Sequence, residues 1–416
     1  MKTLFKFDYG IIGCMSIWLL WSCQEKLPDP ELSLQSPASA TSTTVTVTDR
    51  NPDTFRQSLI NAINQAGNGG TVKLLEGDYL TNRPIVLPHV QINIVGAGKN
   101  NTTIKLEQNP GPTSGLLILR TNGTTIKDLT INAKNNLQYG ACGINTNGAT
   151  DVIVERVRIS NASIGVGTPD NGTGKNPAGL QVLNSNFWNC DHGFNFVRQY
   201  SQVQIPWVKK LVFRNCTFGG KMTAGISIDC GNDGTDGVLS RRALRGAAEA
   251  TATITNMDGT EISGCTFEKA GKYNIAISKA WNVDIFNNTL KGNTGSIPFG
   301  EAINIEHEAY DITIEGNTIT NEGLSNQEHA YISLLTFRDY GNPPLLENGC
   351  RNIIIRNNQF KGDVRTGITG EYARAITING NTFQTPRPTR YDISFYVQST
   401  NIWRWDNGNV NENIVN

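Results

Sequence analysis

Several residues that could perform acid–base chemistry lie in one part of the sequence. Glu306, His307 and Glu308 are consecutive, and Lys279 lies a little upstream. Carboxylates can act as acid, base or nucleophile at a glycosidic bond, whereas histidine or lysine can remove the proton beside a carboxylate. The residue types therefore indicate acid–base bond cleavage, by hydrolysis or by elimination.

Two short strands frame these residues. Ala302–Ile305 and Ile312–Ile314 alternate apolar with polar side chains, which is the period-two pattern of a half-buried strand, and a sharp turn lies between them. A Gly-Asn-Thr-Ile turn follows at 316–319, and the same pattern recurs along most of the chain. The sequence is therefore that of a repeat protein.

Alignment of the repeat on Asn317 gives one turn position in each coil. Nine of ten aligned turns carry an apolar residue two positions later, and the shortest spacing between turns is 23 residues. Asparagines stacked at such a position can hydrogen-bond from coil to coil. The aligned positions are Leu129, Val157, Ser185, Cys216, Cys265, Asn288, Asn317, Asn358, Asn381 and Asn407.

These coils predict the fold class. One coil cannot bury its own apolar face, whereas stacked coils share a continuous core, and a strand–helix unit would need more residues. The segment from Thr54 to Asn407, with its opening stretch Gly69–Tyr79, resembles the right-handed parallel β-helix of the pectate lyase-like superfamily. We expect an all-β parallel β-helix solenoid of about ten or more coils over residues 51–416.

A short capping helix is expected at the N-terminal end of this solenoid. Asp53-Thr54 would cap it, Phe55, Leu59, Ile60 and Ile63 would form its apolar side, and Gly67 would end it. Such a helix would cover unpaired strand groups at the edge of the first coil.

The first fifty residues predict export and membrane attachment. Lys2 and Lys6 precede the apolar run Ile11–Leu20, and Leu20-Trp-Ser-Cys23 resembles a bacterial lipobox in which Cys23 is lipidated. We expect a signal peptide over 1–22 and a flexible tether, rich in Pro, Ser and Thr, over 23–50. The protein would then be exported and lipid-anchored in the cell envelope, at the outer membrane or surface of a bacterium; an ordinary secretory signal is the alternative.

Composition excludes a polyanion-binding role based on overall charge. Lys and Arg number 36 and Asp and Glu number 36, so no net field attracts nucleic acid. Zinc is not indicated, because the sequence has no Cys-x-x-Cys and no histidine cluster. Cys216 and Cys265 occupy adjacent turn positions, where we predict buried thiols rather than a disulfide. The disulfide state is left open for Cys142, Cys190, Cys216, Cys230, Cys265 and Cys350.

The turn after the strand Ala302–Ile305 places the candidate site. In two adjacent coils the equivalent turn is short, at Lys279–Trp281 and His307–Tyr310. These coils lie between coils in which the equivalent turn is long. Because coils stack, the long loops would form the walls of a cleft above Lys279, Glu306, His307 and Glu308. Trp281 and Tyr310, which end the short turns, are candidates for substrate binding. The long turns are Arg198–Lys209, Cys230–Asp258 and Phe337–Cys350.

Paired carboxylates would serve hydrolysis. Alternate strand residues point outward, so Asp229, Ser278 and Glu306 should form one outward row across three coils. Asp229 and Glu306 would then lie about 9–10 Å apart along the stack. That separation admits a water molecule between acid and base, as in inverting glycoside hydrolysis, and Glu308 could shorten it.

Elimination on a uronic-acid polymer would need a base and a cation that neutralises the sugar carboxylate. Lys279 and His307 are the candidate bases. Ca²⁺ is a candidate cofactor, although the aspartate spacing is not that of an EF-hand. The residues that could hold the anionic sugar are Arg198, Arg241, Arg242 and Arg245, and those that could hold Ca²⁺ are Asp229, Asp233 and Asp236.

The sequence favours an exported, monomeric enzyme that cleaves a polysaccharide, with a lyase ahead of a glycoside hydrolase. Ile277-Ser-Lys279, Asn282 and Asn287-Asn-Thr289 resemble the alginate and chondroitin lyases of this fold, but no complete catalytic set matches. Polar turns are also common in solenoids. A non-catalytic surface protein that binds glycan or is structural is therefore the remaining alternative.

Overall fold

The structure is a computed structural model of the 416-residue chain. It describes residues 43–168, 178–197, 210–229, 259–278, 280–292, 301–306, 309–321, 330–335, 349–362, 366–384, 391–396, 399–405 and 412–414. The chain divides into two units, Met1–Ala40 and Thr41–Asn416, and every described residue belongs to the second.

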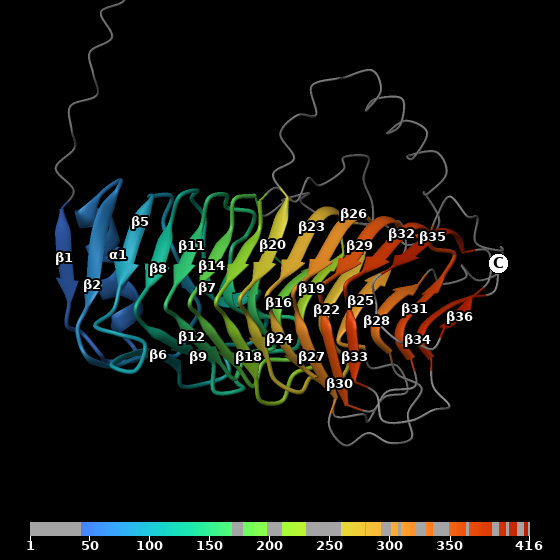
Figure 1. Cartoon of the computed structure of the whole chain (residues 1–416). Coiled ribbons are helices and arrows are strands. Elements are labelled where there is room, and N and C mark those ends of the chain that lie inside the picture. The colour runs from blue at the N-terminus through green and yellow to red at the C-terminus, as the bar shows by residue number, and fades with distance from the viewer. Residues whose placement is uncertain are drawn as a thin grey trace, which may run out of the picture. The chain divides into compact units, whose positions relative to one another are not determined.

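Three parallel β-sheets, here called sheets A, B and C, form a right-handed β-helix, as predicted (Figure 1). The 13 strands of sheet A are β1 (Thr44–Val47), β2 (Gly70–Leu74), β5 (Ile92–Val95), β8 (Thr125–Lys127), β11 (Ile153–Glu155), β14 (Gln181–Leu183), β17 (Val212–Arg214), β20 (Thr260–Ser263), β23 (Trp281–Phe286), β26 (Tyr310–Glu315), β29 (Arg351–Arg356), β32 (Arg374–Asn379) and β35 (Thr400–Trp405). The 11 strands of sheet B are β3 (Gly77–Thr81), β6 (Thr102–Leu106), β9 (Thr130–Asn132), β12 (Arg158–Ser160), β15 (Asn186–Trp188), β18 (Thr217–Gly219), β21 (Thr266–Phe267), β24 (Thr289–Lys291), β27 (Thr318–Asn321), β30 (Gln359–Gly362) and β33 (Thr382–Gln384). The 12 strands of sheet C are β4 (Ile85–Val86), β7 (Gly115–Ile118), β10 (Cys142–Asn145), β13 (Ile164–Gly167), β16 (His192–Val197), β19 (Ala224–Asp229), β22 (Tyr273–Ser278), β25 (Ile303–Glu306), β28 (Ala330–Leu335), β31 (Thr366–Glu371), β34 (Tyr391–Tyr396) and β36 (Glu412–Ile414).

Each complete coil places one strand in each sheet, and the two strands expected around the candidate site are present. The predicted Ala302–Ile305 is β25, displaced by one residue, and the predicted Ile312–Ile314 is the centre of β26. In both strands the alternate isoleucines are buried in the core between the sheets. The period-two pattern therefore correctly predicted which residues of these strands face the core.

The bend between sheets A and B is made by a single residue with left-handed backbone. Its φ lies between 50° and 64° in the nine aligned coils from Asp128 to Gly380, a region that asparagine and glycine tolerate better than other residues. It stands immediately before the turn position on which the repeat was aligned. These residues are Asp128, Arg156, Asn184, Asn215, Gly264, Asn287, Gly316, Asn357 and Gly380.

The aligned turn position forms the predicted ladder of buried amides. Asn317 Oδ1 accepts both the backbone N–H and the Nδ2 of Asn288, at 2.9 and 3.0 Å, and Asn358 does the same for Asn317 at 2.9 Å each. Asn381 continues the series. Two hydrogen bonds between successive asparagines fix the spacing of these coils. The last predicted position, Asn407, lies outside the described residues.

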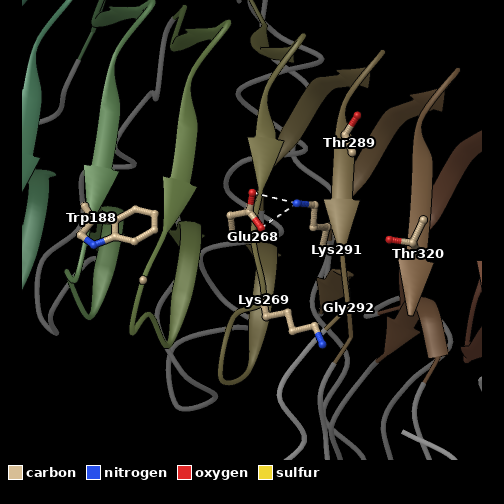
Figure 2. A pocket seen from close by; sticks show the side chains of 8 residues that line it. Trp188, Glu268, Lys269, Thr289, Lys291, Gly292 and Thr320 are labelled. Carbon is tan, nitrogen blue, oxygen red and sulfur yellow. Dashed lines mark hydrogen bonds and ion pairs between the residues drawn. The ribbon is translucent and has the colours of Figure 1, made fainter. Parts of the chain in front are cut away.

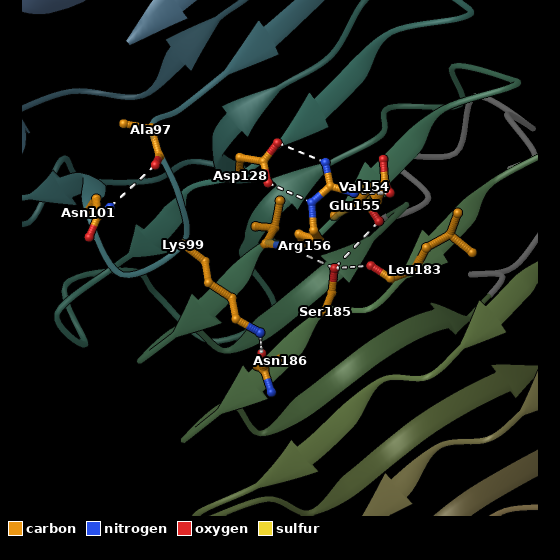
Figure 3. Close-up of polar contacts among 11 residues, drawn as sticks. Ala97, Lys99, Asn101, Asp128, Val154, Glu155, Arg156, Leu183, Ser185 and Asn186 are labelled. Carbon is orange, nitrogen blue, oxygen red and sulfur yellow. Dashed lines mark hydrogen bonds and ion pairs between the residues drawn. The ribbon is translucent and has the colours of Figure 1, made fainter. Parts of the chain in front are cut away.

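Other side chains occupy the ladder in earlier coils. Cys265 Sγ accepts the Cys216 N–H at 3.4 Å, and both thiols are buried and free, as predicted. Ser185 Oγ accepts the Val157 N–H at 3.1 Å (Figure 3). Next to it, Arg156 and Asp128 form a two-pronged ion pair between coils, at 2.6 and 2.9 Å, which lowers the pKa of Asp128 (Figure 3).

The apolar residues two positions after the ladder stack in the core behind sheet B. Phe187, Phe218 and Phe267 lie parallel, with ring centroids 4.8 and 4.7 Å apart. That distance matches the spacing of neighbouring strands, so the rings follow the coils in register. Phe360 and Phe383 repeat the stack at 4.7 Å in later coils.

The first coil carries the expected helix and one unexpected strand. Helix α1 (Phe55–Ala66) buries Phe55, Leu59 and Ile63 and ends at Gly67, but Thr54 makes no side-chain cap hydrogen bond. The segment 23–50 was predicted to be a tether throughout, whereas it contains β1, which pairs with β2. The alternating Thr44–Val47 sequence explains the strand, because Val47 is buried in the core.

Candidate functional site

The candidate site lies on the outer face of sheet C, over β22, β25 and β28. The pairing of Asp229 with Ser278, and of Ser278 with Glu306, confirms the predicted row across three coils. Glu306 is half-buried at the end of β25. The side chain of Asp229 lies outside the described part of the structure, so an acid–base role for this pair stays a prediction.

Polar contacts extend from Glu306 toward the start of β22. Asn304, two residues before Glu306 and fully buried, donates through Nδ2 to Glu306 Oε1. The same Asn304 side chain lies within hydrogen-bonding reach of the Tyr273 hydroxyl. Burial, reinforced by the charges of Glu306 and Glu301, raises the pKa of Tyr273. Tyr273 therefore stays protonated and can donate, but it is a poor base.

A second carboxyl group, Glu301, lies next to this network. Ile275 pairs with Ile303, and the same register carried backward sets Tyr273 opposite Glu301. Glu301 is only 4% exposed, and burial raises its pKa to about 7, with the Glu306 charge adding to the effect. The Ser333 hydroxyl on β28 and the charge of Lys272 act in the opposite direction. At neutral pH this carboxyl group can therefore both hold and release a proton.

Lys272 supplies the positive charge of the cluster. Its Nζ lies 4.6 Å from the centroid of the Tyr273 ring, a cation–π distance. The cluster thus contains an acid with a raised pKa, a half-buried carboxylate, a phenol, an amide and an ammonium group. Sequence reasoning missed Glu301, Tyr273 and Lys272, because it considered outward positions only within strands. A backward extension of the repeat from Ile275 and Ile303 would have aligned Tyr273 with Glu301.

The two aromatic residues predicted to bind substrate lie side by side on neighbouring strands. Trp281 and Tyr310 begin β23 and β26, and their rings stack with centroids 5.5 Å apart. The Arg351 guanidinium lies 4.5 Å from the centroid of the Tyr310 ring and continues the row. Tyr310 follows Glu306 by four residues. The stack therefore lies close along the chain to the carboxylate cluster, while its role in binding stays a prediction.

Many of the predicted site residues lie outside the described residues, so their roles remain predictions. In the part of the chain that the structure describes, no group of three or more His, Cys, Asp or Glu side chains could hold a metal ion. The described residues also contain no helix long and apolar enough to cross a membrane. The undescribed candidates are Lys279, His307, Glu308, Arg198, Arg241, Arg242, Arg245, Asp233, Asp236 and Cys23.

Comparisons with known proteins identify the family. The family model described as the right handed beta helix region matches residues 171–335 and 251–413, which together span more than half of the chain. A search of curated protein sequences finds no match.

Solved structures share this fold at low sequence identity. The A-module of the mannuronan C-5 epimerase AlgE4 from Azotobacter vinelandii is 17% identical, with a TM-score of 0.51, over 87% of this chain and 96% of that one. The DFA-IIIase of Arthrobacter chlorophenolicus A6, without its lid and in complex with GF2, is 10% identical, with a TM-score of 0.54, over 87% of this chain and 94% of that one. The chain belongs to the right-handed β-helix family.

Proposed function

We propose that this protein hydrolyses a polysaccharide on the outer face of sheet C, with Glu301 as the general acid and Glu306 as the base. The observation that carries the proposal is the contrast between the two carboxyl groups. Glu301 is 4% exposed, whereas Glu306 is half-buried at the end of its strand and accepts a hydrogen bond from Asn304. A buried carboxyl group that keeps its proton, placed beside a second carboxyl group, suits a division of roles into acid and base.

The roles follow from the contacts of each group. A protonated Glu301 can donate to the oxygen of the leaving sugar, because burial keeps its proton at neutral pH. Glu306 can take a proton from water, and the Asn304 amide holds its carboxylate in place. Tyr273 acts as a positioning residue through its contact with Asn304.

A glycan substrate is supported by the fold and by aromatic surface near the cluster. The epimerase that shares this fold is named for mannuronan, a polysaccharide. The stacked Trp281 and Tyr310 rings add half-buried aromatic surface, of the kind that sugars contact, on the neighbouring sheet. We therefore place polysaccharides, both neutral and uronic, ahead of other substrate classes.

Matched glutamine variants test the proposal. The full chain is incubated with neutral and uronic polysaccharides while new reducing ends and ultraviolet absorbance are followed together. Hydrolysis should yield reducing ends without an ultraviolet rise, and Glu301→Gln and Glu306→Gln should each slow it by about 10²–10⁴-fold. Glu315→Gln is the control, because Glu315 pairs with Arg356 on sheet A, away from this cluster. Wild-type rates in both site variants would refute the assignment.

Elimination is the second candidate, and the position of Lys272 favours it. Its ammonium group lies beside Tyr273 and acts on Glu301, where it could neutralise the carboxylate of a uronic sugar. An ultraviolet rise on a uronic polymer, lost in Lys272→Gln, would move the assignment to a lyase. Lys279→Ala and His307→Ala would then test the two bases that the sequence predicts.

A further inference from the structure

A groove on a different sheet is separate from the carboxylate cluster. It lies on the outer face of sheet B, across β15, β18, β21, β24 and β27, and its volume is about 690 Å³ (Figure 2). Pockets that bind small ligands measure about 300–1,000 Å³. The groove is therefore large enough to hold several sugar rings in a row.

One row of side chains forms its floor, with one residue from each coil. Trp188 pairs with Gly219, and Lys291 pairs with Thr320. Phe218, Phe267 and Leu290 pair in sequence one residue earlier, so Glu268 stands between Gly219 and Lys291. The row from Trp188 to Thr320 covers four strand steps, or about 19 Å.

Gly219 creates the space in which Trp188 lies against the sheet. A Cβ at Gly219 would stand 2.6 Å from the Trp188 ring and 3.2 Å from Glu268 Cγ. Any larger residue would therefore push the indole away. Trp188 nevertheless remains 45% exposed, and Figure 2 shows its ring directed along the row toward Glu268. An indole fixed on one face and open on the other can stack on the apolar face of a sugar.

Polar groups follow the indole along the same groove. Lys291 Nζ binds both Glu268 oxygens, at 2.9 and 2.8 Å, which holds the two side chains in a defined position (Figure 2). The Thr289 and Thr320 side chains border the groove, and Lys269 adds a second ammonium group. An aromatic platform followed by fixed polar groups suits a ligand that has apolar ring faces and a rim of hydroxyl groups.

We propose that this groove is a glycan-binding site distinct from the cluster on sheet C. It binds an extended chain of pyranose sugars, with one ring on Trp188 and the following sugars hydrogen-bonded to Glu268, Lys291 and the threonines. The site holds the polymer and performs no chemistry. Its existence does not depend on hydrolysis at Glu301 and Glu306, because the two regions occupy different sheets.

Calorimetric titration with two probes tests the site, one a neutral glucan hexaose and the other an oligouronate hexamer. The full chain carries Glu301→Gln and Glu306→Gln, so that neither probe is cleaved. Trp188→Ala should remove one binding event or weaken it at least tenfold, as truncation of a central aromatic contact does. Trp188→Phe should restore part of the binding, because a smaller aromatic face remains.

Trp403→Ala is the matched control, since Trp403 is 50% exposed but lies on β35 of sheet A. The control should bind as the parent does. Unchanged binding in Trp188→Ala, an equal loss in Trp403→Ala, or no heat from either probe with the parent protein would overturn the proposal. If the wild-type protein cleaves neither probe while binding that depends on Trp188 is present, this result would count against the hydrolase assignment alone.

Discussion

Replacement of Asn358 with alanine removes a fully buried amide that connects three coils. Its Oδ1 accepts the Asn317 N–H and Asn317 Nδ2, both at 2.9 Å. Its Nδ2 donates to the Ile314 carbonyl at 2.9 Å and to Asn381 Oδ1 at 3.0 Å. Alanine supplies no polar atom, so these four contacts are lost together and their partners stay buried.

The size of the effect follows from the groups that lose this partner. Asn317 Nδ2 keeps a second bond, to the Ile285 carbonyl, and Asn381 Oδ1 still accepts the backbone N–H of residue 358. The Asn317 N–H and the Ile314 carbonyl lose the bond that the side chain provided. Each buried polar group left without a partner costs about 1–3 kcal/mol. The free energy of unfolding should therefore fall by about 2–6 kcal/mol.

Urea unfolding followed by circular dichroism measures this change, and hydrogen exchange at the Asn317 amide localises it. Gln359→Ala is the control, because Gln359 is the next residue, is exposed, and contacts the ladder only through its backbone. Its free energy of unfolding should stay within about 0.5 kcal/mol of the wild type. Equal midpoints in the two variants, with unchanged protection of Asn317, would show that the amide ladder does not stabilise these coils.

Three further perturbations have defined expected results. The pKa of Glu301 rises from 4.5 to about 7 on folding, so the folded state binds more protons than the unfolded state between these pH values. The free energy of unfolding should therefore fall by about 3 kcal/mol as pH rises from 4.5 to 7. Glu301→Gln should flatten this part of the pH–stability curve. Phe218→Ala opens a cavity between two stacked phenylalanines and should lower the free energy of unfolding by about 3–5 kcal/mol in a denaturant titration. Asp128→Asn breaks the part-exposed ion pair with Arg156, so it should cost about 1 kcal/mol or less, and the difference from wild type should shrink as salt is added.

The pattern of strand and turn residues in each coil is local, so it could be predicted from the sequence. Asn288, Asn317 and Asn358 share a turn pattern, and the structure joins them through the predicted hydrogen bonds. The row that contains Ser278 and Glu306 followed from strand period and stacking alone. Parallel register repeats the same geometry in every coil, so one correctly aligned turn fixed the faces of many strands.

The chemistry of the cluster could not be read in the same way, because it depends on burial. Glu301 precedes β25, and only the packed structure shows that it is 4% exposed. Its raised pKa comes mainly from desolvation and then from Glu306, five residues later in the chain. A sequence pattern gives the identity of such groups, but the solvent around them follows from tertiary packing.

Ladder and site are connected through the coils that they share. Strand β25 follows the turn at Asn288, and β28 follows the turn at Asn317, so the coils that carry Glu301 and Ser333 are joined by the doubly hydrogen-bonded amides. At earlier turns a hydroxyl or a thiol replaces the amide: Ser185 Oγ and Cys265 Sγ each accept one backbone N–H from the preceding coil. A proton on Glu301 depends on close packing between neighbouring coils, because desolvation dominates its pKa. The paired hydrogen bonds between successive asparagines therefore lie in the coils where a small change in coil spacing would alter the pKa of Glu301.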